Sequence, residues 1–598
     1  MKFKKLVSSF TAFICICSIN SSPCTKAICY DNIEIGQIYN KTEEDTSESV
    51  GKYNEFTYTK YDDHIVINFC DETAVNVEIP ETIEGLPVTA IKNSNYDQIF
   101  SKNLETIVIP KTIEEIGVYA ALESIETVIM GDCLKSVTVS PDNQHFSSED
   151  GILFNKDKTT LLRYPSAKTD TSYVIPKTVE SIKDCAFKNC RNLSSIIIGD
   201  GVQKIGCDAF NGCSAIEEIT VPDNVSTIGG GCFISCTSLK AVKLSENITS
   251  IDGDTFYNCT NLKSLTIPAK VENIYTGYSP PGSGGAYQSA FYGCSSLEEI
   301  NVDENNENYT SENGILFSKN KDTLFLFPSQ KTDREYTVPE GVKRIGCAAF
   351  LNCKNLESIH LPDSLEELAD HYVFWNCSSL TSIKIPKNVM IISYSLFWGC
   401  TSLETIEVDE ENECYYDIDG VLFDKNQSML IKYPAGKQNT EYIVPKSVKR
   451  IEDYAFRSSY LTSVIIPENV TYIGYLAFYE NKYLNEITIR NPNCEFYSLF
   501  GYHPVTRFTG TVYGYENSTA KVYAEKNNYK FESIAPNGDV NADGEFNIAD
   551  IVVMQGYLLA VPNFKLDNWQ GGDFYKDNRI DIFDLCFMKH ELIKNNFL

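Results

Sequence analysis

Residues 193–213 read LSSIIIGDGVQKIGCDAFNGC, and the next two stretches, IEEITVPDNVSTIGGGCFISC at 216–236 and LKAVKLSENITSIDGDTFYNC at 239–259, repeat its apolar positions at identical offsets. A fixed period of this length is the signature of a repeat architecture, in which each coil packs on its neighbours. The chain has 598 residues, which is too long for one compact core. The period therefore predicts an elongated stack of coils.

Each repeat contains the parts of one coil. Leu193, Ile196 and Ile198 give a short strand whose alternate side chains point inward. A proline such as Pro222 then ends the strand, because proline cannot donate to a sheet ladder. After a turn, a Val and Ile pair and a Phe-x-x-Cys group close the far side of the coil. One coil cannot bury this apolar set alone, so we expect stability to come from stacking.

The cysteines hold repeat positions. The chain has 21 of them, which in an exported protein would suggest disulfides. However, Cys190, Cys213, Cys236 and Cys259 recur every 23 residues, so each has the same place in its coil. Stacked coils set neighbouring Cα atoms about 4.8 Å apart with parallel Cβ vectors, which suits a disulfide badly. We predict buried free thiols that act as small apolar side chains.

Longer repeats carry a second signature, a Gly-led turn within an apolar run. It reads DGILF at 150–154, NGILF at 313–317 and DGVLF at 419–423, and we expect it to join two short apolar strands. Together with the Leu-x-x-Ile-x-Ile-Pro and Ala-Phe-x-x-Cys patterns, it resembles the BspA-like branch of leucine-rich repeats of bacterial surface and secreted proteins. The resemblance runs from about Tyr53 to Ile534 and implies a β-rich α/β solenoid of leucine-rich repeats with hairpin insertions.

Two irregularities are candidate functional features. One coil, between Ile274 and Phe291, is long and bears SPPGSGG at 279–285, which is either a tolerated insertion or a binding loop. The other is an aromatic stripe, in which a large ring follows the Phe of the coil. Its members are Tyr257, Tyr292, Trp375 and Trp398. Rings in a row suit sugar faces or a protein partner, although rings that only seal the coil edge give the same pattern.

From residue 538 on, the pattern changes to alternating acidic and amide side chains. The first set is Asp539, Asn541, Asp543, Glu545, Asn547 and Asp550, with Gly544 at the sixth position. Ca²⁺ takes six to eight oxygen ligands, and these positions converge only if the chain turns sharply at the sixth residue. Glu545 would bind through its backbone carbonyl. The spacing predicts a calcium loop of the EF-hand type, with Asp in place of the final Glu.

A second loop begins 34 residues later. Its expected ligands are Asp573, Asp577, Asp581 and Asp584, with Arg579 at the backbone-carbonyl position. Tyr575 replaces the third ligand and Asn578 replaces the glycine, so the occupancy of a second calcium site stays open. Each loop precedes an apolar helical run, and neither has a full helix before it.

Paired loop-then-helix units of this kind resemble type I dockerins. The resemblance covers about residues 538–594 and implies a small all-α calcium-binding dockerin domain, which docks its carrier onto a cohesin domain of a scaffold protein, usually in a cellulosome. It also implies that loop positions ten and eleven, and residues further along the second helix, contact the cohesin. The matching residues are Ile548, Ala549, Ile582, Phe583, Lys589 and His590. The broken second loop leaves symmetric dual docking open.

The expected organisation is a signal peptide at 1–27, the solenoid at 28–507, its C-terminal cap at 508–535 and the dockerin domain at 536–598. Lysines followed by the apolar stretch from Leu6 to Ile19 are typical of a secretory signal. The cap is predicted as strand, short helix and strand, with Ser518 or Thr519 capping the helix. No other run of about 18 apolar residues occurs, so we expect no transmembrane segment.

The net charge and the absence of catalytic motifs limit the classes of function that the sequence supports. A net charge of -30 disfavours nucleic acid, because phosphate binding needs clustered Lys and Arg. The six histidines show no metal spacing, and no Gly-x-Ser-x-Gly or phosphate loop appears. We therefore expect a secreted, non-catalytic binding or adhesion protein, held outside the cell or at its surface by a scaffold, whose solenoid binds an extracellular glycan or protein and which serves polysaccharide degradation. A secreted glycoside hydrolase or peptidase of unrecognised type and a passive structural spacer are the alternatives.

Overall fold

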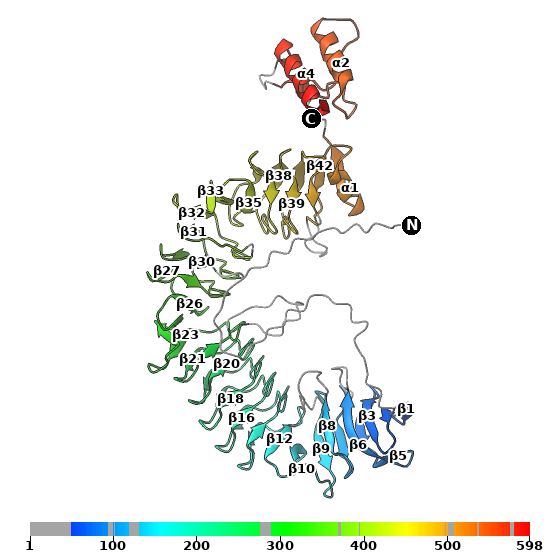
Figure 1. Cartoon of the computed structure of the whole chain (residues 1–598), viewed down its shortest axis with the longest axis vertical. Coiled ribbons are helices and arrows are strands. Elements are labelled where there is room, and N and C mark those ends of the chain that lie inside the picture. The colour runs from blue at the N-terminus through cyan, green and yellow to red at the C-terminus, as the bar shows by residue number, and fades with distance from the viewer. Residues whose placement is uncertain are drawn as a thin grey trace, which may run out of the picture. The chain divides into compact units, whose positions relative to one another are not determined.

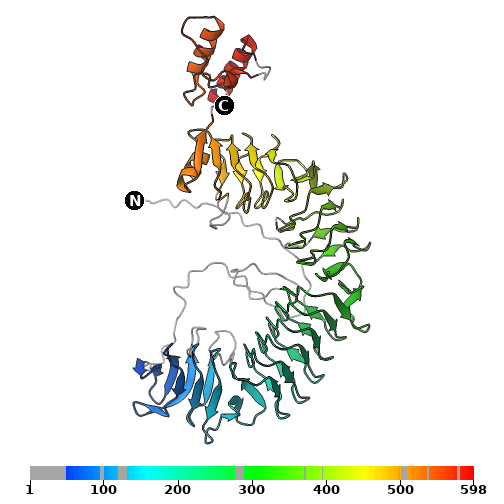
Figure 2. The same ribbon diagram turned by 180° about the vertical axis from the view of Figure 1, so that it is seen from behind.

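The computed structural model describes residues 49–93, 100, 102–118, 131–275, 289–368, 372–393, 395–496, 498–499, 508–534, 538–574 and 579–597. From β1 (Ser49–Tyr53) to β43 (Lys530–Ser533) the described chain forms successive coils of short strands that follow one another in sequence order (Figure 1 and Figure 2). The predicted signal peptide, and most of the long loop before Phe291, lie outside the described residues.

Each regular coil contributes one strand to each of two columns of parallel strands. In the coil that begins at Leu193, β15 (Ser195–Ile197) pairs with β13 (Ser172–Val174) of the coil before it. On the other side of the same coil, β16 (Lys204–Ile205) pairs with β14 (Ser181–Ile182). Paired residues are one sequence period apart, so the repeat itself sets the register. The predicted solenoid of leucine-rich repeats is confirmed.

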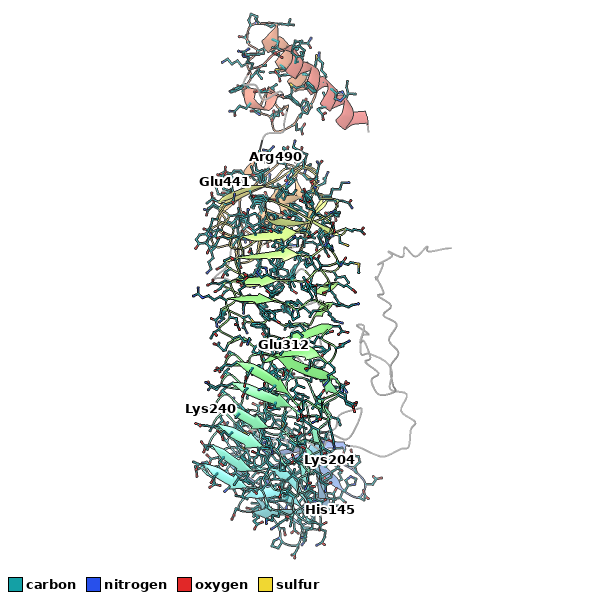
Figure 3. All side chains as sticks on the ribbon, turned by 90° about the vertical axis from the view of Figure 1, so that its left-hand side faces the viewer. His145, Lys204, Lys240, Glu312, Glu441 and Arg490 are labelled. Carbon is teal, nitrogen blue, oxygen red and sulfur yellow. The ribbon has the colours of Figure 1, made fainter. Side chains whose placement is uncertain are left out.

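The two columns run through most of the described chain, and Figure 3 shows Lys240 beside the first and Lys204 beside the second. The other strands of the first column are β4 (Asn76–Glu78), β7 (Thr106–Ile109), β9 (Ser136–Val139), β17 (Glu218–Thr220), β19 (Ala241–Lys243), β21 (Ser264–Ile267), β23 (Glu299–Val302), β27 (Glu335–Thr337), β29 (Ser358–His360), β31 (Ser382–Ile385), β32 (Thr405–Val408), β36 (Glu441–Ile443), β38 (Ser463–Ile466), β40 (Glu486–Ile489) and β42 (Thr511–Gly514). Those of the second column are β6 (Leu86–Asn93), β8 (Glu115–Val118), β12 (Thr160–Arg163), β18 (Thr227–Ile228), β20 (Ser250–Ile251), β22 (Asn273–Ile274), β26 (Thr323–Leu326), β28 (Arg344–Ile345), β30 (Glu367–Leu368), β35 (Met429–Lys432), β37 (Arg450–Ile451), β39 (Tyr472–Ile473) and β41 (Glu495–Phe496). At the N-terminal end, β2 (Phe56–Lys60), β3 (Ile65–Cys70) and β5 (Thr82–Ile83) complete a sheet with β1, β6 and β8.

The core lies between the two columns and is built from the repeated apolar positions. Leu193, Ile205 and Phe210 are each at most 1% exposed. The coil phenylalanines stack on one another, with 5.6 Å between the ring centroids of Phe210 and Phe233 and an interplanar angle of 5°. Burying a side chain of this size stabilises the fold by roughly 1.5–3 kcal/mol. Because each ring is buried by the next coil, this stabilisation exists only in the stack.

The repeated cysteines form a thiol ladder inside the solenoid. The thiol ladder consists of Cys190, Cys213, Cys236, Cys259, Cys294, Cys353, Cys377 and Cys400. Each thiol approaches a backbone carbonyl of the preceding coil; Sγ of Cys236 lies 3.2 Å from the Phe210 oxygen and Sγ of Cys400 lies 3.0 Å from that of Phe374. Burial raises the pKa of Cys236 to about 12. The predicted burial of these thiols is confirmed, and the described cysteines form no disulfides.

Three coils carry hairpin insertions, and here one detail of the prediction was wrong. The Gly-led turn joins a leading strand of mixed polarity (FSSE, YTSE or YYDI) to an apolar one. The first pairs are β10 (Phe146–Glu149) with β11 (Ile152–Asn155), β24 (Tyr309–Glu312) with β25 (Ile315–Ser318), and β33 (Tyr415–Ile418) with β34 (Val421–Asp424). The leading strand lies at the sheet edge, where outward side chains meet solvent. A second turn then returns the chain to β12, β26 or β35, which rejoins the second column.

A buried asparagine fixes each insertion to the coil before it. Asn306 is fully buried; its side-chain amide donates to the carbonyls of Pro268 (2.8 Å) and Val271 (2.9 Å). Its oxygen accepts from the amides of Asn308 (2.9 Å) and Tyr309 (2.8 Å). Asn143 and Asn412 repeat this arrangement eight residues before their own turn glycine, as Asn306 does. We call these three residues the asparagine clamps.

The C-terminal region contains the helices. After β42, α1 (Thr519–Lys526) is capped by the Ser518 side chain, and β43 then pairs with β42, so the predicted strand, helix and strand are present. Beyond residue 538 the described elements are α2 (Ile548–Leu558), α3 (Trp569–Gly572) and α4 (Ile582–Phe597). Among the described residues, no helix has the length and apolar character needed to cross a membrane.

Candidate functional site

The first acidic loop is organised around two fully buried carboxylates, Asp539 and Asp550. The Asp539 carboxylate accepts hydrogen bonds from the amides of Asp543 (3.2 Å) and Gly544 (2.9 Å). The Asp550 carboxylate accepts from the amides of Val540, Asn541 and Asn547 at 2.9, 3.2 and 2.9 Å. Gly544 has φ +92°, the left-handed turn that the sixth loop position requires. The loop thus closes on itself through backbone donors.

The same loop concentrates negative charge. Burial raises the pKa of the Asp539 carboxyl, and the nearby Asp550 and Asp543 carboxylates add to the effect, against the lowering by the two amide hydrogen bonds. None of the three carboxylates forms an ion pair with a described Lys, Arg or His side chain. Asn541 instead donates from its side-chain amide to Asp543 at 2.9 Å. Buried oxygens without a cationic partner are the donor set that a hard cation favours.

The loop also starts a helix. The Asn547 side chain accepts from the Ala549 amide at 2.7 Å, and together with Asp550 it forms a capping box at the beginning of α2. Capping of this kind stabilises a helix by about 1 kcal/mol. The residues expected to bind the cation are therefore also those that position the helix.

The second loop repeats the frame with an offset of 34 residues. The Asp584 carboxylate accepts from the amides of Phe574 (2.9 Å) and Asp581 (3.0 Å), as Asp550 accepts from Val540 and Asn547. The Asp581 side chain accepts from the Phe583 amide at 2.7 Å, as Asn547 does from Ala549. Asp573 and Asp584 are buried, whereas Arg579 is exposed.

The central part of the second loop, which includes Tyr575 and Asp577, lies outside the described residues. Within the part of the chain that the structure describes, no cluster of three or more His, Cys, Asp or Glu side chains is arranged to hold a metal ion. The expected first site also draws on the amide oxygens of Asn541 and Asn547 and on the Glu545 carbonyl. In chemical type and in backbone frame, the first loop fits Ca²⁺.

Both helices expose apolar side chains next to the loops. Ile548, Ile582 and Phe583 are 67%, 57% and 61% exposed, and Ala549, Lys589 and His590 are exposed as well. The opposite faces form the core of the module. Its buried residues are Val540, Ile551, Met554, Leu585 and Met588. The predicted contact residues therefore lie on the solvent side of each helix, beside the loop that caps it.

The exposed face extends beyond the residues predicted from the sequence. Val552 and Leu559 continue it along α2 from Ile548, at spacings of four and eleven residues. Cys586 and Ile593 continue it along α4 from Ile582 at the same spacings. Residues four and eleven apart fall on one helix face. The 34-residue offset between the loops, applied beyond them, was the signal that could have found these four side chains.

The aromatic stripe forms a chain of ring contacts along one side of the solenoid. Tyr257 stacks on Tyr292 with ring centroids 5.3 Å apart and an interplanar angle of 8°, and Tyr292 contacts Trp375 at 6.0 Å. Further along, the Arg457 guanidinium lies 4.5 Å from the ring centroid of Trp398. These contacts occupy ring faces that a stacked sugar would need. The geometry favours the edge-sealing alternative, and a ligand role for the stripe stays a prediction.

The comparisons with known proteins identify two families. Residues 166–278, 325–435 and 435–502 match the family described as BspA type leucine rich repeat region, in six copies. Residues 537–593 match the dockerin type I domain. No curated protein matches the sequence. Both matched families are domains of non-catalytic kinds.

Solved structures of bacterial repeat proteins are similar to this chain. A leucine rich cell surface protein of Faecalibacterium prausnitzii is 24% identical with a TM-score of 0.41, over 73% of this chain and 94% of its own. The pneumococcal vaccine antigen PcpA is 17% identical with a TM-score of 0.36, over 81% and 98%. A leucine-rich repeat protein of Bacteroides ovatus is 17% identical with a TM-score of 0.31, over 83% and 100%. On the two family matches, the chain is a BspA-type leucine-rich-repeat protein that carries a C-terminal type I dockerin domain.

Proposed function

We propose that the protein is a secreted, non-catalytic binding or adhesion component that docks, in the presence of calcium, onto a cohesin domain of a scaffold protein. The dockerin match implies the cohesin partner and a cellulosome-type assembly. The solenoid is the part that binds an extracellular glycan or protein, in the service of polysaccharide degradation. The place of action is the outside of the cell or its surface, where dockerin-bearing proteins and bacterial leucine-rich-repeat surface proteins act.

The observation that carries the proposal is the duplicated frame, in which a buried aspartate caps each docking helix. In the first loop, Ca²⁺ would be held by side-chain oxygens of Asp539, Asn541, Asp543, Asn547 and Asp550 and by the carbonyl of Glu545. In the second, the candidates are Asp573, Asp577, Asp581 and Asp584 and the carbonyl of Arg579. When bound, the cation neutralises the carboxylates and cross-links the loop. The chain itself supplies the amide donors that keep the two buried carboxylates in place.

Docking would follow from the exposed helix faces. Ile582 and Phe583 present an isoleucine and a phenylalanine side by side at the start of α4, and Ile548 with Ala549 presents a smaller pair on α2. Apolar side chains exposed to this degree mark interaction surfaces on soluble proteins. Burying either large side chain against a partner contributes roughly 1.5–3 kcal/mol. Lys589 and His590 flank the α4 pair and supply polar contacts at the rim.

The test is binding of the full chain to immobilised cohesin domains from several scaffold proteins, with calcium and with a chelator. We expect one or more cohesins to bind only with calcium. The variant D539A/D550A should lose calcium from the first loop and should lose cohesin binding, whereas I582A/F583A should keep calcium and lose at least tenfold in cohesin affinity. Asp567→Ala, which removes an exposed carboxylate of the same module, is the matched control and should behave as the wild type. Calcium-independent binding, or equal binding by all variants, would refute the proposal.

A further inference from the structure

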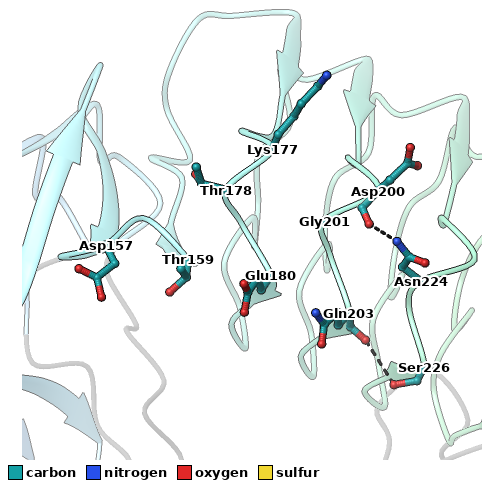
Figure 4. A pocket seen from close by; sticks show the side chains of 10 residues that line it. All are labelled: Asp157, Thr159, Lys177, Thr178, Glu180, Asp200, Gly201, Gln203, Asn224 and Ser226. Carbon is teal, nitrogen blue, oxygen red and sulfur yellow. Dashed lines mark hydrogen bonds between the residues drawn. The ribbon is translucent and has the colours of Figure 1, made fainter.

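A polar groove crosses the turns of four successive coils near the first hairpin insertion (Figure 4). Its volume is about 730 Å³. One row of side chains comes from the residue just before each second-column strand, as with Glu180 and Gln203, and the other from the turn after each first-column strand, as with Lys177 and Asp200. Thr178 lies between the two rows on its coil. No aromatic ring lines the groove.

Four polar side chains of this groove have no partner within the described part of the fold, whereas those of Thr159, Asn224 and Ser226 are hydrogen-bonded. Thr159 accepts from the Asn155 side chain at 2.8 Å, and Asn224 and Ser226 donate to the backbone carbonyls of Asp200 and Gln203 (Figure 4). Among the described residues, the side-chain polar atoms of Lys177, Glu180, Asp200 and Gln203 form no hydrogen bond or ion pair with another protein group. At two equivalent places further along the solenoid, neighbouring side chains of the same rows are paired. Lys343 and Glu366, which correspond to Glu180 and Gln203, form an ion pair at 3.5 Å. Lys446 and Glu468, which correspond to Lys177 and Asp200, lie 3.8 Å apart.

The groove therefore holds an unpaired set of donors and acceptors that recurs with the coil spacing of about 4.8 Å. Glu180 and Asp200 supply carboxylate acceptors, Lys177 supplies an ammonium donor, and Gln203 supplies both functions on one amide. The acidic residues and the net charge of -30 disfavour an anionic polymer. A neutral chain of sugar units matches this pattern, because each unit carries several hydroxyls and has a length similar to the coil spacing. Successive units could therefore meet polar side chains of successive coils. A peptide strand rises only about 3.3 Å per residue and falls out of step with the coils.

We propose that this groove is the glycan-binding site of the solenoid and takes an extended, neutral oligosaccharide by hydrogen bonds rather than by ring stacking. The inference deepens the proposed function, since it gives the solenoid one site and one class of ligand. The aromatic stripe, whose rings contact one another and Arg457, is then a structural seam and no part of the site. Binding through exposed polar groups alone is weak, because each contact replaces one with water.

The experiment titrates the full chain with neutral hexaoses of glucose, xylose and mannose, followed by calorimetry and by hydrogen exchange of the groove amides. We expect one of the three to bind, with slower exchange confined to the turns at 177–180 and 200–203. The variant E180A/Q203A should lose at least tenfold in affinity. The matched control K343A/E366A changes the equivalent positions before β28 and β30, outside the groove, and should bind the hexaose as tightly as the wild type does. Because these side chains are exposed and Glu180 and Gln203 have no side-chain partner, the folded state of E180A/Q203A should be intact by circular dichroism.

Each other outcome contradicts the inference. If a hexaose binds but E180A/Q203A binds it equally well, the site lies elsewhere, and the proposed adhesion function stands. If none of the three binds while the chain captures a cationic sugar polymer that salt releases, the groove acts only as part of an acidic surface. If no sugar binds at all, the solenoid is left with a protein ligand, and the cohesin experiment on the dockerin domain is unaffected.

Discussion

Lys432 should destabilise the protein near neutral pH, although it lies in the core. It is 4% exposed, and its ammonium group donates to one carbonyl, that of Tyr454, at 3.1 Å. Burial, with a contribution from the positive charge of Arg457, lowers the pKa of Lys432 to about 7, against a small opposing effect of Cys400. At the equivalent position of the preceding hairpin coil the chain has Leu326, so an apolar side chain is compatible with this place in the fold.

The sign follows from proton binding. The unfolded chain holds the lysine proton up to its ordinary pKa of 10.5, whereas the folded chain releases it near pH 7. Between these values the unfolded state binds more protons, so stability rises with pH through this window and is flat below it. The shift corresponds to a cost of about 4 kcal/mol at neutral pH. Lys432→Leu should remove most of this cost and the pH dependence with it.

The measurement is the opening free energy of the amides in β35 and β37, from native-state hydrogen exchange at pH 6.5 and 9.5. Local opening is the suitable quantity, because a long repeat array does not unfold in a single step. We expect Lys432→Leu to be more stable than the wild type at pH 6.5, with the difference shrinking at pH 9.5. Lys449→Leu, the same change at an exposed lysine, is the control and should shift neither value. A variant that is less stable than the wild type at pH 6.5 would refute the reasoning.

Two further predictions concern the solenoid. Asn306→Ala should destabilise its hairpin insertion by about 3 kcal/mol, because it leaves two buried carbonyls and two amides without hydrogen-bond partners. Limited proteolysis should then cleave the variant faster than the wild type within residues 303–317. The control Asn305→Ala, which changes the exposed neighbour, should be cleaved no faster than the wild type. Iodoacetamide should label Cys133, Cys207 and Cys586, which are exposed, and leave the thiol ladder unmodified until the chain is denatured. Mass spectrometry would identify the labelled cysteines. Labelling of the thiol ladder in the native protein would contradict the packing described for it.

Much of the fold follows from the sequence because its determinants are periodic. The coil period sets the strand register, and the recurrence of Cys213 and Cys236 was enough to predict the thiol ladder. The backbone frame of the first acidic loop could also be predicted, because loop positions one and six, Asp539 and Gly544, are defined by their spacing within a single turn. In such cases the interacting residues are local or repeat exactly one period apart. The calcium ligands of both loops stay a prediction.

The remaining features depend on contacts that do not repeat with the coil. An asparagine clamp such as Asn306 bonds to carbonyls 35 and 38 residues earlier, so its burial cannot be inferred from local pattern. A lysine such as Lys432 is expected at the surface, because its side chain is charged. The returning strand of the hairpin insertion instead directs this side chain into the core. The stripe rings at Tyr257 and Tyr292 were correctly placed in a row, yet only the structure gives the orientation that turns their faces to each other.

The proposed function depends most directly on calcium binding by the dockerin loops. The chain has 3 tryptophans, of which Trp569 lies on α3 between the two loops. Calcium should therefore be titrated into the full chain labelled with 5-fluorotryptophan, with calorimetry in parallel and with D539A/D550A and Asp567→Ala as test and control. We expect saturable calcium binding that shifts only the Trp569 resonance in the wild type and in Asp567→Ala. In D539A/D550A this binding should be lost or halved. No binding by the wild type, or undiminished binding by D539A/D550A, would contradict the proposed function.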